Sequence, residues 1–149
     1  MPRIRSVLLL AAATGVLGLP RPVLACRVEA RPVAFGMLWD LPRRGAEAQG
    51  LVLLDCAAAA AGGGLRVSLG PGQGAAEAGQ RRLQGPAGGL PYNLYTDPAH
   101  RQLWGDGLGA TVAPIAPANG LLTVYGYIPP QLSPAPGTYS DAVEVTIDW

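Results

Sequence analysis

Glycine and proline interrupt this chain so often that its apolar segments stay short. After residue 25, apolar runs end repeatedly at Gly or Pro, as at Gly36, Gly62 and Pro129. A content of 21 Gly and 15 Pro favours short elements joined by tight turns over long helices. Because 49% of the residues are hydrophobic and only 14% are charged, the chain is too apolar to be disordered. We therefore expect one packed, all-β domain.

Alternation of apolar and polar residues indicates where the strands lie. The clearest case is Tyr139–Trp149, whose apolar face consists of Val143, Val145, Ile147 and Trp149. The segment 50–56 is almost continuously apolar, which is typical of a strand buried on both faces. Further strands are predicted at 26–36, 65–69, 82–83, 90–95 and 121–128, with a long loop at 96–118. These short strands favour an antiparallel β-sandwich.

The first 25 residues have the features of a secretory signal. Two arginines form a positive start, residues 7–19 are apolar, and Val23-Leu24-Ala25 precedes a cleavage point before Cys26. The 13-residue apolar stretch is shorter than the roughly 20 residues of a transmembrane helix. No later segment is long and apolar enough to span a membrane. We expect residues 1–25 to be removed and residues 26–149 to form a single exported domain.

Two cysteines, Cys26 and Cys56, would meet an oxidising compartment after export. One disulfide would close a loop of about 30 residues and stabilise the fold by roughly 3–4 kcal/mol. An alternative exists, because Val23-Leu24-Ala25-Cys26 loosely resembles a lipoprotein cleavage box, in which Cys26 would carry lipid. Proline at positions 20 and 22 and the second cysteine favour the disulfide.

No set of residues supports catalysis, metal binding or nucleic-acid binding. The single histidine, His100, lies in a polar loop, and no serine after residue 25 sits in a Gly-x-Ser-x-Gly turn. Asp97, Asp106 and Asp141 lack the spacing of a calcium loop and are expected in turns. No cluster of basic residues is present. We expect no enzyme, no cofactor, no metal, no nucleic-acid partner and a solvated His100.

Trp104-Gly105-Asp106-Gly107 has two interpretations. On an exposed loop, Trp104 would be a surface ligand contact that stacks on a sugar, in a free-standing secreted or lipid-anchored glycan-binding module. In a β-turn, Trp104 would instead fold over the edge of the sandwich. Tyr139 is a candidate for the tyrosine corner of immunoglobulin-like sandwiches, which is a structural role.

Short motifs follow one another in a characteristic order along residues 26–149. They are Cys26, Phe35-Gly36, Gly50–Cys56, Leu90-x-Tyr92-x-Leu94-Tyr95-x-Asp97, Trp104-Gly105-Asp106-Gly107, Val124-Tyr125-Gly126-x-Ile128-Pro129 and Pro136-Gly137-x-Tyr139-x-Asp141. Each motif is short, but the ordered set is specific and covers essentially all of residues 26–149. In this order the motifs resemble the spore coat protein U family.

The resemblance implies an immunoglobulin-like sandwich that lacks its last strand, as in subunits of archaic chaperone–usher pili. The missing strand would leave an apolar groove, lined here by Val143, Val145, Ile147 and Trp149. In such pili a periplasmic chaperone covers the groove before an outer-membrane usher and a neighbouring pilin-like subunit replace it by strand addition. This implies a structural or adhesive fimbrial subunit in cell adhesion and biofilm, which passes through the periplasm to the cell surface or the extracellular space.

A polymerising pilin also needs a donor segment ahead of its first cysteine. If the signal is cut after Ala25, nothing precedes Cys26, and a cut after Gly18 leaves a segment that contains Pro20 and Pro22. Each proline removes one hydrogen-bond donor from a ladder. We therefore expect an acceptor of a donor strand that is not itself a donor, at a fibre tip or end, or outside a fibre.

Overall fold

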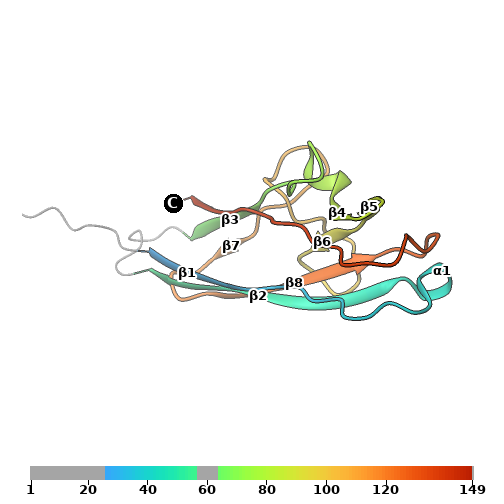
Figure 1. The fold of residues 1–149 in the computed structure, drawn as a ribbon. Coiled ribbons are helices and arrows are strands. Elements are labelled where there is room, and N and C mark those ends of the chain that lie inside the picture. Colours follow the sequence, from blue (N-terminus) through green and yellow to red (C-terminus); the bar gives the residue numbers. More distant parts are fainter. Residues whose placement is uncertain (1–25, 57–63, 149) are drawn as a thin grey trace, which may run out of the picture.

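The computed structural model describes residues 26–56 and 64–148, which form two packed layers of strands (Figure 1). The elements are β1 (Cys26–Arg31), α1 (Leu41–Arg44), β2 (Ala46–Cys56), β3 (Leu65–Leu69), the 3-10 helix η1 (Ala78–Gln80), β4 (Arg82–Gly85), β5 (Gly88–Pro91), β6 (Asn93–Tyr95), β7 (Ile115–Ala116), β8 (Leu121–Ile128) and β9 (Val145–Asp148). The expected all-β class is confirmed. Among the described residues, no helix is long and apolar enough to cross a membrane. The predicted signal, residues 1–25, lies outside the described residues and stays a prediction.

One layer is an antiparallel sheet with the strand order β1-β2-β8-β6. Its longest strand, β2, pairs with β1 on one side and with β8 on the other. Gly50, Val52 and Leu54 are buried, whereas Leu51 and Leu53 between them are half-buried. The prediction that this segment is buried on both faces is wrong, because only its inner face is covered by the second layer.

The second layer combines the sheet β7-β3-β9 with the hairpin β4-β5. Its central strand, β3, buries Leu65, Val67 and Leu69 and pairs antiparallel with both neighbours. The strand β7 lies within the segment that the sequence predicts as a loop. It consists of two residues, and its partner strand is far away along the chain, so local alternation gives no sign of it.

Two predicted strands pair over only part of their length. β1 ends at Arg31 although alternation continues to Phe35, because Pro32 has no N–H to donate to a ladder. β9 begins at Val145 although alternation begins at Tyr139. Both strands are edge strands of their sheets. The chain next to each of them therefore lies outside the main ladders, and this position defines the site described below.

Cys26 and Cys56 face each other at the end of the β1–β2 ladder and form a disulfide. The described residues contain no free cysteine. A thiol that takes part in a disulfide cannot carry a lipid, so the bond argues against the lipid-anchor alternative. It fastens the edge strand β1 to the body of its sheet.

The core between the layers contains Trp104, which is fully buried. Its indole Nε1 donates a hydrogen bond of 2.9 Å to the Val67 carbonyl. The buried Arg81 guanidinium donates to the carbonyls of Leu69, Gly70 and Trp104, and desolvation lowers the pKa of Arg81. The interpretation of Trp104 as a surface ligand contact is therefore wrong, because its ring and its N–H are both used inside the sandwich.

Candidate functional site

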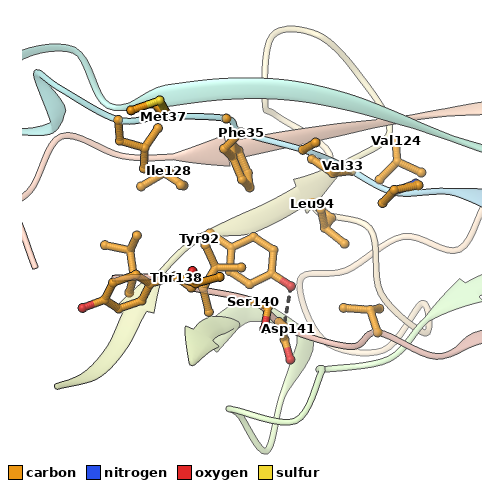
Figure 2. A pocket seen from close by; sticks show the side chains of 18 of the residues that line it. Val33, Phe35, Met37, Tyr92, Leu94, Val124, Ile128, Thr138, Ser140 and Asp141 are labelled. Atoms are coloured by element: carbon orange, nitrogen blue, oxygen red, sulfur yellow. Dashed lines mark hydrogen bonds between the residues drawn. The ribbon is translucent and has the colours of Figure 1, made fainter. Parts of the chain in front are cut away.

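An apolar groove of about 1050 Å³ lies between the two layers. Figure 2 shows Val33 and Phe35 on one side of the groove and Thr138, Ser140 and Asp141 on the other. Between them, inward-facing side chains of the sandwich form its floor, including Leu90, Tyr92, Leu94, Val124 and Ile128. The groove is thus a gap in the hydrophobic core that the described chain does not fill.

The first rim of the groove, residues 32–39, follows β1 and joins no ladder within the described residues. It is held by packing against the sheet. A Cβ on Gly126 would overlap Val33 and lie 2.9 Å from the ring of Phe35, so glycine at this position allows the rim to cross β8 closely. The Phe35 ring meets Tyr92 edge to face at 6.2 Å. Side chains therefore fix this rim while its backbone stays outside the sheets.

The second rim, residues 133–145, leads into β9. The Tyr139 hydroxyl donates a 2.8 Å hydrogen bond to the carbonyl of Ala135, four residues upstream, and its ring lies where a Cβ on Gly85 would be. This bond has the form that the tyrosine-corner interpretation predicts. Ser140 and Gln84 exchange two backbone hydrogen bonds of 2.7 and 3.0 Å. Local bonds thus hold the second rim at the edge of the second layer.

The residues that the sequence assigns to the groove divide into three groups. Val143 and Val145 line the groove and are half-buried. Ile147 faces the same way and packs against the core, but lies beyond the groove lining. Trp149 lies outside the described residues. The prediction that these residues share one face is therefore correct as far as Ile147. The groove lining on this side begins earlier in the chain, at Ser133, and ends at Val145.

A polar pair in the groove is missing from the residues that the sequence assigns to it. The Tyr92 hydroxyl donates a 2.8 Å hydrogen bond to Oδ2 of Asp141 (Figure 2). The backbone N–H of Gln73 donates a 2.7 Å bond to Oδ1. Burial, and then the bond to Asp141, raise the pKa of Tyr92. The sequence did contain a sign of this position. Asp141 lies two residues before Val143 and four before Val145, so the alternation that turns those valines inward also turns Asp141 inward.

The other two aspartates considered for a calcium site, Asp97 and Asp106, and the histidine lie outside the groove lining, with Asp97 and His100 in the same loop after β6. Asp97 accepts hydrogen bonds from the N–H groups of Arg101 and Gln102, and these lower its pKa, the Gln102 bond most. His100 stacks on Tyr127 at 4.6 Å with its side chain 16% exposed, so the expectation of a solvated histidine is wrong. Within the described residues, no group of three or more His, Cys, Asp or Glu could hold a metal ion.

Comparisons with known proteins support the fold and identify the family. The family model of the Spore Coat Protein U domain matches residues 16–146. A chain in the crystal structure of the CsuC–CsuE chaperone–tip adhesion subunit pre-assembly complex, from archaic chaperone–usher Csu pili of Acinetobacter baumannii, has a similar fold with a TM-score of 0.60. The two chains are 20% identical, and the similarity covers 85% of this chain and 40% of that chain.

No curated protein matches this chain significantly. At 20% identity the structural likeness shows the fold alone, and this chain spans less than half of that neighbour. The likeness agrees with the expected immunoglobulin-like sandwich. The family match extends over most of the sequence, from before the first described strand into β9. The chain therefore belongs to the spore coat protein U family.

Proposed function

We propose that this protein is a subunit of a chaperone–usher type fimbria and accepts a donor strand in the groove. One observation carries the proposal: the two rims, residues 32–39 and 133–145, flank an apolar gap between two sheet edges. An extended segment in this gap would meet the unladdered backbone of the first rim on one side, the free side of the second rim on the other, and mainly apolar side chains below. Its outward face would complete the surface of the sandwich.

The length of the first rim suits one donor strand. The first rim has eight residues, which as an extended strand span about 26 Å at ~3.3 Å per residue. A segment of this length directs about four side chains inward, since successive side chains alternate. Burying an apolar side chain stabilises by about 1.5–3 kcal/mol, so four of them supply a strong driving force for binding.

The family and the open groove together suggest the route of the protein. A periplasmic chaperone would cover the groove after export, an outer-membrane usher would receive the complex, and a neighbouring pilin-like subunit would then insert its strand. The destination would be the cell surface or a fimbrium, with a role in adhesion and biofilm. We place the protein at a tip or terminal position, because Pro20 and Pro22 weaken the segment before Cys26 as a donor.

The test is thermal unfolding of the oxidised, exported chain with and without donor peptides. The peptides are taken from the apolar N-terminal extensions of pilin-like proteins. At a peptide concentration of about 100 times Kd, binding stabilises by about 2.7 kcal/mol, which raises Tm by about 10 °C. A peptide with proline at alternate positions serves as the control, since it cannot form a ladder.

Two protein variants locate the effect. Val143→Lys places a charge in the groove and should abolish the rise in Tm. Glu144→Lys places the same charge on the exposed, outward face of the same segment and should keep the rise. A chain that is monomeric, unfolds cooperatively and responds to no donor peptide would contradict the proposal. That result would favour a free-standing secreted module, whose binding surface would not include the buried Trp104.

A further inference from the structure

One carboxylate lies inside the mainly apolar groove. Of the two charged residues that line the groove, Arg31 is exposed, whereas Asp141 is half-buried and lies beside Tyr92 (Figure 2). A donor strand in the groove would run along the second rim and cover Asp141. The side chain that it places there must therefore be compatible with a carboxylate that has lost contact with water.

The position of Asp141 is fixed from two sides, and its capacity to accept hydrogen bonds is not used up. Oδ2 accepts from the Tyr92 hydroxyl and Oδ1 from the Gln73 N–H. An ionised carboxylate has about four acceptor sites, so two are left. Both bonds come from parts of the chain that are distant in sequence, which keeps the carboxylate in one place before a partner arrives.

The nearest buried cation does not take up the remaining acceptors. The Arg81 guanidinium donates to the carbonyls of Leu69, Gly70 and Trp104, and none of its hydrogen bonds reaches Asp141. The charge of Arg81 nevertheless reaches the groove, since Arg81 lowers the pKa of Tyr92 and Asp141 raises it. Because a buried cation already lies in this region, we expect a neutral hydrogen-bond donor, not a second cation, opposite the carboxylate.

Resting on the proposed function, we propose that Asp141 selects the donor strand. The partner segment is apolar at its other inward positions and carries a hydroxyl or amide side chain, such as Thr or Asn, opposite Asp141. An apolar side chain there would bury the free acceptors without partners. An acidic side chain would bring two like charges together. Each mismatch would weaken binding by about tenfold.

The experiment uses synthetic ten-residue peptides with Val at the inward positions and Gln at the outward ones. Each Val is replaced in turn by Thr, Asn or Asp. Thr and Val have nearly the same shape, as do Asn and Asp, so each pair isolates one chemical property. Binding to the oxidised, exported chain is measured as the peptide-dependent rise in Tm. We expect one position at which Thr binds about tenfold more tightly than Val, and Asn about tenfold more tightly than Asp.

Three variants assign the preference to Asp141. Asp141→Asn should remove the penalty for Asp at that position. Tyr92→Phe frees Oδ2, and should keep or increase the preference for Thr. Glu144→Gln removes a carboxylate from the exposed, outward face of the same segment, outside the groove lining, and should leave both preferences unchanged. Tm without peptide shows for each variant that the fold is intact.

The outcomes separate this inference from the proposed function. If the all-Val peptide raises Tm and no position distinguishes Thr from Val or Asn from Asp, the role of Asp141 is refuted while the groove remains an acceptor. The same conclusion follows if the preference persists unchanged in Asp141→Asn. If neither this set nor the natural donor peptides raise Tm, the acceptor function fails, and the inference fails with it.

Discussion

Gly126→Ala tests whether the first rim crosses the sheet as the structure shows. In an ordinary strand this change is favourable by about 0.5–1 kcal/mol, because glycine loses more entropy on folding. At residue 126, however, the new Cβ would overlap Val33 and lie 2.9 Å from Phe35 Cζ. Overpacking of this kind destabilises by about 1–3 kcal/mol. The net result should be a loss of about 0.5–2 kcal/mol.

Urea denaturation measures this loss. With a slope of about 1.5 kcal/mol per molar urea, the midpoint should fall by about 0.3–1.3 M. Gly79→Ala is the control, since its Cβ would meet only Leu103, at an ordinary 3.5 Å, and should change stability little. If Gly126→Ala is as stable as the wild type or more stable, Val33 and Phe35 do not lie over Gly126, and the first rim is placed wrongly.

Three further perturbations test the core and its bonds. Trp104→Phe leaves the Val67 carbonyl without its donor and should lower the free energy of unfolding by about 1–3 kcal/mol in urea denaturation. Reducing the disulfide should lower it by about 3–4 kcal/mol, seen as an earlier thermal transition in the presence of a reductant. The pKa of Tyr92 is raised in the folded state, so its protonated hydroxyl contributes to the free energy of unfolding. This contribution is complete below about pH 10, the pKa of an unfolded tyrosine, and is lost as the pH rises further. Urea denaturation at a series of pH values should show this decline, and Tyr92→Phe should flatten it.

Local alternation predicted which face each strand buries but not where its ladder ends. Val143, Val145 and Ile147 share a face, as predicted. Ladder ends depend on partners elsewhere in the chain, and for β1 on the missing N–H of Pro32. The same limit explains Trp104, since its glycine-rich surroundings are typical of an exposed turn, while its hydrogen-bond partner Val67 belongs to β3.

Only part of the polar pair in the groove, Tyr92 and Asp141, could be predicted from the sequence. Alternation counted back from Val143 places Asp141 on the inward face, which argues against a simple turn residue. Nothing near it in sequence indicates Tyr92 or Gln73 as its partners, because 49 and 68 residues separate them from Asp141. The sequence therefore carries the direction of the side chain, whereas the tertiary fold supplies the bonds that make a carboxylate stable there.

An open groove between two unpaired edges presents a general hazard, because any apolar extended segment can add to it. An inward-facing charge is one of the ways in which proteins limit such pairing. Asp141 meets this description, since a purely apolar strand would have to bury a carboxylate with unused acceptors. Specificity is a difference between affinities, and it can come from penalising wrong partners as well as from favouring the right one. A single carboxylate at the second rim would do both: it weakens indiscriminate apolar insertion and rewards a strand that carries a hydrogen-bond donor in the correct register.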